Sequence, residues 1–231
     1  QPVKVLATLK QCDTYLAGTG FGLGLTLLYL NGGWSAFRSA NPMSFMEYYL
    51  VNDIGLLIIP LIIIILCKQS LQNYGLQMCE RKHIYAALGI GLLFFPVVLM
   101  TAKSADFQSY YLSAMRQSGA IEDMPLEINV FGLVRHQLIL VTYMFAWEWF
   151  FRGFLVNSVN RITNPVCAVL LQAALFTVMH FGKPTVEVIS SFFGAVLLGI
   201  WALRSRSMLP CFVVHAFLTV LNDVAVIVQA R

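Results

Sequence analysis

Seven long apolar runs recur along the chain, and they limit its fold more than any other feature. A helix needs roughly 20 mostly apolar residues to cross the hydrocarbon core of a bilayer, and these runs come close to that length. Connectors that carry glycine, proline or charged residues, such as 31–42, separate them and predict turns between helices. The predicted spans are Tyr15–Leu30, Leu50–Cys67, Ile84–Ala102, Phe131–Asn160, Pro165–Phe181, Val186–Leu203 and Leu209–Gln229.

Composition agrees with this pattern. Of the 231 residues, 58% are hydrophobic and only 11% are charged, and the mean hydropathy is +0.74. In a typical soluble domain about a quarter of the residues are charged. This chain has far fewer charged residues and therefore needs lipid around it. We therefore expect an all-α polytopic membrane bundle of about seven transmembrane helices, with six or eight as alternatives. The whole chain, 1–231, is expected to form a single integral-membrane domain.

Charge placement predicts how the bundle lies in its membrane. Short cytoplasmic loops collect Lys and Arg, and with the N-terminus inside, nine of the 15 basic residues fall on inner segments. We expect an integral protein of a bacterial inner membrane with a cytoplasmic N-terminus. The net charge of +4 then reflects topology and contact with anionic lipid, and no basic block indicates nucleic acid. The nine are Lys4, Lys10, Lys68, Arg81, Lys82, Arg152, Arg161, Arg204 and Arg206.

Three further features are structural. The connector 103–130 contains aromatic and aliphatic positions that predict a short helix in the membrane interface. The five cysteines form no C-x-x-C pair, which predicts neither a disulfide framework nor a zinc knuckle. The first 14 residues lack the long apolar core of a signal peptide, so we expect none there.

Ionisable side chains inside the predicted spans mark the candidate site. Each costs at least a few kcal/mol at bilayer depth, so such groups usually face a cavity, pair with one another or carry a task. Asp53 is expected at the membrane interface. Arg135, His136 and Asp223 are expected to line a cavity or to determine the topology. The full set is Asp53, Arg135, His136, Glu148, Arg152, His180, His215 and Asp223.

Helix arithmetic predicts which of these groups meet. At 1.5 Å per residue, Glu148 and His180 lie about 18 and 22 Å from the turn that joins their helices, at similar depth. His215 lies only about 9 Å from the predicted start of its own helix, which places it shallower unless that helix begins earlier or tilts. Glu148 and Arg152 are four residues apart and share one helix face. On its own, this spacing fits a buried ion pair that locks the bundle equally well.

Phe176 and His180, four residues apart, share a second helix face, and a third polar face lies in the last predicted helix. His215, Thr219 and Asn222 recur at helical spacing, so their side chains point the same way. Together with Glu148 and His180 they could activate a water molecule and stabilise an oxyanion. The carboxylate and the two imidazoles could equally bind a divalent metal such as zinc, with water in the fourth position. Both alternatives remain open from the residues alone.

Three short motifs resemble a known signature. They are "WEWFFRGF" (147–154), "FTVMH" (176–180) and "HAFLTVLN" (215–222). In order and spacing they resemble E-E-x-x-x-R, F-x-x-x-H and H-x-x-x-N of the CAAX-protease and bacteriocin-processing (CPBP or Abi) family of intramembrane endopeptidases. The resemblance covers about residues 140–225. The matching residues are Glu148 (second glutamate), Arg152, Phe176, His180 and His215.

Two positions depart from that signature. Trp147 stands where the family has its first glutamate, and Thr219 stands where it has an asparagine. Asn222, one turn further along the same face, is the candidate replacement for the amide, and Glu148 for the missing carboxylate. Adjacent residues of a helix point about 100° apart, so a shift of the carboxylate from 147 to 148 changes its direction.

The resemblance implies an intramembrane endopeptidase that hydrolyses a membrane-attached protein or peptide. Glu148 and His180 would activate water, His215 with Asn222 or Thr219 would polarise the scissile carbonyl, and Arg152 would support the glutamate. Trp147 and Thr219 favour a second hypothesis, an inactive pseudoprotease that binds a membrane partner or acts as a chaperone. A third hypothesis is a small proton-coupled transporter with a relay of buried Glu, Arg and His; no inverted repeat supports it.

Overall fold

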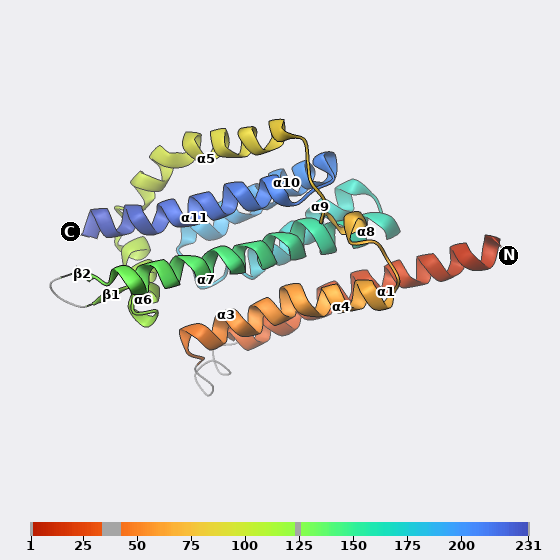
Figure 1. Cartoon of the computed structure of the whole chain (residues 1–231), viewed down its shortest axis with the longest axis horizontal. Helices are drawn as coiled ribbons and strands as arrows, with labels where there is room; N and C mark the ends of the chain where they lie inside the picture. Colours follow the sequence, from red (N-terminus) through yellow and green to blue (C-terminus); the bar gives the residue numbers. More distant parts are fainter. Residues whose placement is uncertain (1, 34–42, 123–125, 231) are drawn as a thin grey trace.

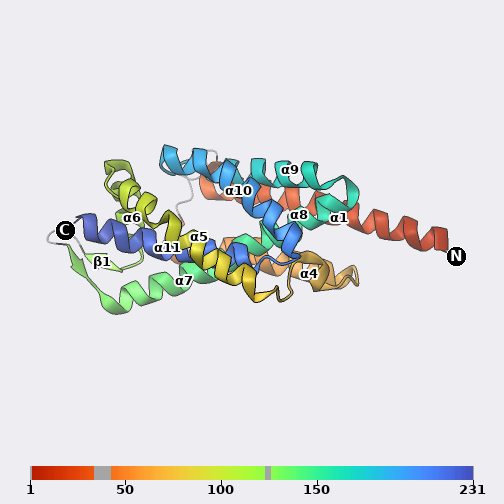
Figure 2. The same ribbon diagram turned by 90° about the horizontal axis from the view of Figure 1, so that it is seen from above.

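The computed structural model describes residues 2–33, 43–122 and 126–230, which form a bundle of long helices along one axis (Figure 1). The predicted all-α fold is confirmed. The ends of the chain lie at opposite ends of the bundle in both views (Figures 1 and 2). Most of the predicted turn at 31–42 lies outside the described residues.

Each predicted span corresponds to a helix or to a continuous series of helices. The bounds are α1 (Pro2–Leu28), α3 (Phe45–Asp53) with α4 (Ile59–Leu66), α5 (Arg81–Thr101), α7 (Val130–Glu148) with α8 (Val156–Ile162), α9 (Pro165–Val178), α10 (Thr185–Ser205) and α11 (Leu209–Ala230). Short π-helical segments follow α1 and connect α3 to α4 and α7 to α8, and a 3-10 turn, Leu71–Tyr74, follows α4.

Five of the described helical rods are long and apolar enough to cross a membrane. They are Phe45–Leu66, Arg81–Thr101, Val130–Ile162, Thr185–Ser205 and Leu209–Ala230. The apolar helix α9 is shorter and ends three residues before the C-terminal end of the predicted span Pro165–Phe181, where the turn that carries His180 begins. The chain is therefore an integral membrane protein, and the count of about seven crossings stays a prediction.

The connector 103–130 contains the predicted short helix and one element that was not predicted. Helix α6 (Ala105–Gln117) begins at Ser104, whose hydroxyl accepts a hydrogen bond from the Phe107 amide. A two-stranded antiparallel ribbon then pairs β1 (Ile121–Glu122) with β2 (Glu127–Ile128). Each strand has only two residues, too few for a period-two pattern to be visible in the sequence. Both elements lie at the end of the bundle where α11 finishes (Figure 1).

The start of α7 packs tightly on the loop before this ribbon. Asn129 caps the helix by accepting a hydrogen bond from the Gly132 amide at 3.0 Å. Arg135 donates a hydrogen bond to the Ser118 carbonyl oxygen. A Cβ at Gly132 would lie 1.9 Å from the carbonyl oxygen of Gly119. Only glycine allows α7 to approach the loop this closely.

Replacing Gly132 with Ala is therefore expected to lower the free energy of unfolding by about 1–3 kcal/mol, since backbone has to move to relieve the overlap. Chemical or thermal unfolding in detergent measures the loss. The matched control is Gly89→Ala in α5, where an added Cβ meets nothing within 4 Å. Alanine favours a helix over glycine by about 1 kcal/mol, so the control variant should be at least as stable as the parent.

The long rod 130–162 is not a regular α-helix throughout. Residues Trp149–Leu155 form a π-helical segment between α7 and α8. Its aromatic side chains are fully buried in the main core cluster and therefore pack inside the protein and do not face lipid. π-Helical turns are rare and often occur at functional sites. Here the segment begins immediately after Glu148 and contains Arg152.

Candidate active site

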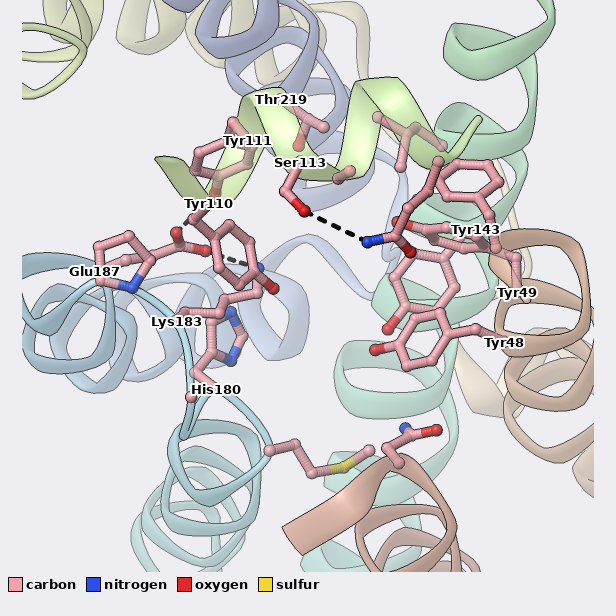
Figure 3. A pocket seen from close by; sticks show the side chains of 18 of the residues that line it. Tyr48, Tyr49, Tyr110, Tyr111, Ser113, Tyr143, His180, Lys183, Glu187 and Thr219 are labelled. Carbon is pink, nitrogen blue, oxygen red and sulfur yellow. Dashed lines mark hydrogen bonds and ion pairs between the residues drawn. The ribbon is translucent and has the colours of Figure 1, made fainter. Parts of the chain in front are cut away.

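A cavity of about 740 Å³ lies among α3, α6, α7, α10, α11 and the turn after α9. Figure 3 shows tyrosines from α3, α6 and α7 facing it from two sides, with His180 and Lys183 on the same side as the tyrosines of α6. The lining is rich in polar side chains for a cavity in a membrane protein. Those that concern the site are Trp147, His180, His215, Thr219, Asn222 and Asp223.

Glu148 and His215 form a close polar contact at this site. Oε1 of Glu148 lies 2.6 Å from Nδ1 of His215. The carboxylate is fully buried, whereas 24% of the His215 side chain is exposed, on the wall of the cavity. An ionised carboxylate only accepts hydrogen bonds, so Nδ1 of His215 donates and Nε2 keeps its lone pair. Glu148 is not itself a lining residue and therefore lies behind His215.

The predicted difference in depth between these two residues is wrong. The arithmetic assumed that α11 begins at the membrane surface. In the structure, Ser207 and Met208 immediately before α11 are fully buried, and the Met208 amide donates to the Gly75 carbonyl oxygen at 3.1 Å. Because α11 starts inside the bundle, six residues of helix are enough to bring His215 to the level of Glu148.

Arg152 contacts the other carboxylate oxygen. Its Nε lies 3.2 Å from Oε2 of Glu148, and both side chains are fully buried. The geometry of this ion pair is not that of a hydrogen bond, and the guanidinium nitrogens have no hydrogen-bond partner in the described residues. Instead, Cζ of Arg152 lies 4.0 Å from the centre of the Phe176 ring, a cation–π contact. Glu148 thus bridges a catalytic candidate and a structural one.

His180 occupies the cavity wall without touching Glu148. Its Nδ1 donates to the Phe176 carbonyl oxygen at 2.8 Å, since a carbonyl can only accept. The imidazole stacks on the Phe176 ring with centroids 4.4 Å apart. Among the interactions of the described residues, no hydrogen bond joins His180 to Glu148 or His215. The two histidines share the cavity, and each has an Nε2 that no described residue engages.

Trp147 lies where the family motif has its first glutamate, and it packs beside His180. The two rings meet edge to face with centroids 5.6 Å apart, and a similar contact joins Trp147 to Phe176. Its Nε1 is buried without a hydrogen-bond partner in the described residues. The indole therefore fills the space beside His180 that a motif carboxylate would occupy.

Thr219 and Asn222 both line the cavity, but their polar groups differ in availability. The Thr219 hydroxyl donates to the His215 carbonyl oxygen at 2.9 Å, which uses its proton inside the helix. Asn222 is 9% exposed, and its amide nitrogen has no partner in the described part of the chain. Of the two, Asn222 has the free donor that an oxyanion requires.

The residues present do not form the metal site that the sequence left open. Within residues 2–33, 43–122 and 126–230, no three His, Cys, Asp or Glu side chains converge as a group that could hold a metal ion. Glu148 and His215 meet, but Nδ1 of His180 is bonded to a carbonyl oxygen. We therefore derive no step through a metal.

Two charged residues at the cavity rim were not among the predicted site residues. Lys183 lies 2.6 Å from Oε1 of Glu187, and the Tyr111 hydroxyl donates to Oε2 at 2.5 Å (Figure 3). Burial alone lowers the pKa of Lys183, but the Glu187 carboxylate outweighs it and raises the pKa above its ordinary value. Their i,i+4 spacing was a visible signal; the contact with Tyr111 in α6 was not.

Residues 130–221 match a family model, Rce1-like, which is described as "Type II CAAX prenyl endopeptidase Rce1-like". The matched segment contains the first two motifs, the third motif up to Leu221, and every predicted site residue except Asn222. No curated protein and no solved structure matches the chain. The family predicted from the motifs is thereby confirmed, and residues 130–221 form a domain of the Rce1-like type II CAAX prenyl endopeptidase family.

Proposed function

We propose that this chain is an intramembrane endopeptidase whose cavity-facing base is His215, held in place by Glu148. The hydrogen bond of 2.6 Å between a fully buried carboxylate and a partly exposed imidazole carries this proposal. It differs from the role expected from sequence, in which Glu148 itself took the proton from water. Both oxygens of Glu148 are engaged, by His215 and Arg152, whereas Nε2 of His215 is available.

The chemistry follows from these positions. A carboxylate on Nδ1 fixes the tautomer of an imidazole and stabilises the imidazolium that forms. Nε2 of His215 takes a proton from a water molecule in the cavity, and the resulting hydroxide attacks the scissile carbonyl carbon. The Asn222 amide, seven residues or about 10 Å further along α11 than His215, donates to a carbonyl of the bound peptide beyond the scissile bond. The tetrahedral intermediate collapses when the proton on Nε2 passes to the leaving amine, which breaks the C–N bond and leaves His215 neutral.

His180 has a supporting role in this proposal. Because Nδ1 donates to a backbone carbonyl, Nε2 is an acceptor on the cavity wall. A water molecule between two imidazole acceptors has one proton directed at each of them, which orients its lone pairs for attack. His180 is therefore proposed to position the water that His215 deprotonates. The family activity implies a membrane-associated peptide or protein as the substrate.

Orientation and location belong to the same proposal. In Figure 1, α1 begins at the end of the bundle where α4 finishes, where α8 turns into α9 and where α10 turns into α11. The basic residues of these connections, Lys68, Arg161, Arg204 and Arg206, lie at that end. The positive-inside rule supports placing it in the cytoplasm. We accordingly propose a bacterial inner membrane with a cytoplasmic N-terminus.

Peptide cleavage by purified protein in lipid tests the proposal. Membrane-anchored peptides are incubated with the parent and with His215→Ala, and products are identified by mass spectrometry. Loss of a positioned general base costs about 10²- to 10⁴-fold in rate, so His215→Ala should lower kcat by at least about a hundredfold. His83→Ala is the control, because His83 pairs with Trp201 on another face. Equal cleavage by parent and His215→Ala would contradict the proposal.

One observation supports a second candidate, a non-catalytic binding protein. The Trp147 indole fills the place of a family carboxylate and packs on His180. On this hypothesis the parent binds membrane-anchored peptides without cleaving them. The same assay separates the two: bound but intact peptide with the parent protein, together with cleavage by Trp147→Glu, would favour the binding protein.

A further inference from the structure

A second carboxylate–imidazole pair lies in the same cavity, at positions that match no family motif. Oδ2 of Asp223 in α11 lies 3.2 Å from Nε2 of His136 in α7. The Gln137 amide donates to the same oxygen at 2.8 Å. Asp223 and His136 are each 1% exposed, and both line the cavity. The proposed reaction uses neither of them.

The charges of the cavity wall do not balance. Among its described lining residues, Asp106, Glu187 and Asp223 are acidic and Lys183 is the single Lys or Arg. Lys183 is bound to Glu187. No Lys or Arg ion pair is formed by Asp223 in the described residues. Burial of an ionised carboxylate raises the free energy of the folded protein unless a cation accompanies it. A cationic group bound in the cavity next to Asp223 would therefore be stabilised.

Two polar atoms of this pair, Oδ1 of Asp223 and Nδ1 of His136, have no hydrogen-bond partner among the described residues. Oδ1 of Asp223 forms no hydrogen bond with the described residues, and it is not among the fully enclosed atoms without partners. Asp223 lines the cavity, so Oδ1 can accept a hydrogen bond from a donor that enters it. Nδ1 of His136 is enclosed and also lacks a partner within the described part. Oδ1 is a free, directed acceptor for a cationic donor.

The surroundings suit a cation on an apolar stem. The ring of Phe45 stacks on His136 with centroids 5.2 Å apart, and Tyr49 packs on Phe45 at 4.7 Å. Tyr49 in turn meets Tyr143 edge to face at 4.9 Å. Figure 3 shows Tyr49 and Tyr143 together on one side of the cavity. Aromatic faces attract ammonium and guanidinium groups and cover their methylene chains.

We propose that Asp223, oriented by His136 and Gln137, is a subsite for a cationic group of the peptide substrate, a Lys or Arg side chain or a free N-terminal amine. This subsite deepens the proposed endopeptidase function and rests on it. Asp106 at the exposed mouth adds negative charge along the entry path, which favours the approach of a basic peptide.

The spacing from His215 predicts where the cation lies in the substrate. Asp223 follows His215 by eight residues, or about 12 Å along α11, and His136 precedes Glu148 by twelve, or about 18 Å along α7. An extended peptide advances about 3.3 Å per residue. The cationic group should therefore lie about four to five residues from the scissile bond, with little preference for a cation at other positions.

Paired peptides in lipid nanodiscs test the subsite. In one pair, a lysine four or five residues from the cleavage point is replaced by norleucine in an N-acetylated peptide; in another, the N-terminus is free or acetylated. We expect kcat/KM to be about 10- to 100-fold higher for the cationic member, the usual effect of a hydrogen bond to a charged group. The pair that responds identifies the source of the cation.

Two variants assign the preference to Asp223. Asp223→Asn should remove the preference, so that the cationic and neutral peptides are cleaved with equal kcat/KM, with a thermal unfolding check of the fold. Asp106→Asn is the matched control and should keep the preference. Equal losses in both variants would indicate a general field and overturn the subsite, as would equal cleavage of both peptides by the parent.

A binding measurement keeps this inference separable from the proposed reaction. In a His215→Ala background, fluorescence anisotropy of the labelled peptides measures affinity without turnover. Tighter binding of the cationic peptide that disappears with Asp223→Asn would support the subsite even if no variant cleaves, in which case the proposed catalysis fails alone. Equal affinity for cationic and neutral peptides would overturn the subsite even if the parent cleaves both.

Discussion

Replacing Glu148 with Gln is expected to lower kcat for peptide cleavage by about 10³- to 10⁴-fold while the peptide still binds. The amide offers either a donor or a neutral acceptor to Nδ1 of His215. In either case the neutral amide no longer stabilises the imidazolium. When the amide donates to Nδ1, the imidazole proton moves to Nε2 and points at the water. An equivalent change in a serine protease triad costs about 10⁴-fold. Steady-state kinetics with a membrane-anchored peptide measure kcat and KM separately.

The control for this variant is the same substitution at Glu80. That carboxylate pairs with Lys82 at 2.8 Å on the surface, where both side chains are about two-thirds exposed or more. The Lys82 ammonium, as a hydrogen-bond donor and as a charge, holds the pKa of Glu80 below its ordinary value. Neither Glu80 nor Lys82 is among the residues that line the cavity. Glu80→Gln should cleave like the parent. Unchanged kcat in a folded Glu148→Gln protein would refute the role of the Glu148–His215 pair.

Replacing Arg152 with Met is expected to lower the free energy of unfolding by about 3–5 kcal/mol, because it leaves the buried Glu148 carboxylate without its cation. The loss of the contact with the Phe176 ring adds to the effect. The double variant Glu148→Gln/Arg152→Met removes both charges and should recover much of that stability, since a neutral replacement of a buried ion pair is often tolerated. Unfolding in detergent or lipid, followed by two independent probes, measures each variant.

Arg161→Met serves as the comparison. Arg161 pairs with Asp13 at 3.6 Å, and its side chain is 29% exposed, so its loss should cost no more than about 1 kcal/mol. If Arg152→Met were as stable as Arg161→Met, the buried pair would not stabilise the bundle. The double variant is also expected to remain inactive, which separates the structural role of Glu148 from its role beside His215.

These outcomes bear on how one carboxylate can have two partners. Oε2 faces Arg152, four residues further along the same helical rod, whereas Oε1 faces His215 in α11. An ion pair that locks the bundle and a working carboxylate were alternatives from sequence alone. In the structure both contacts exist at once. The carboxylate that contacts Arg152 is also the group that can stabilise an imidazolium on His215.

The membrane fold was predictable because it depends on local properties. Span length and hydropathy act within each run of residues, and the predicted segments agree with the observed helices to within a few residues at most of their ends. The main exceptions are α1, which begins thirteen residues before the predicted span Tyr15–Leu30, and α3, which begins five residues before the predicted span Leu50–Cys67. The ribbon β1–β2 was missed because each strand has only two residues and no periodic pattern.

The candidate site was predictable as a set of residues and not as a set of contacts. Glu148, His180 and His215 stood out since ionisable groups are rare at bilayer depth. Their partners did not follow: Glu148 binds His215 and leaves His180 to the Phe176 carbonyl oxygen. Parallel, straight helices that start at the membrane surface were assumed, and the buried start of α11 breaks that assumption.

The sequence by itself determined that this is a helical membrane protein with three polar motifs in family order. Only the tertiary structure decided that His215 faces the cavity with Glu148 behind it, that Trp147 fills the place of a glutamate, and that Asp223 meets His136. The physical reason is that hydropathy and helix length act along the chain. The depth at which a helix starts, its π-helical turns and its packing depend on neighbours far away in sequence.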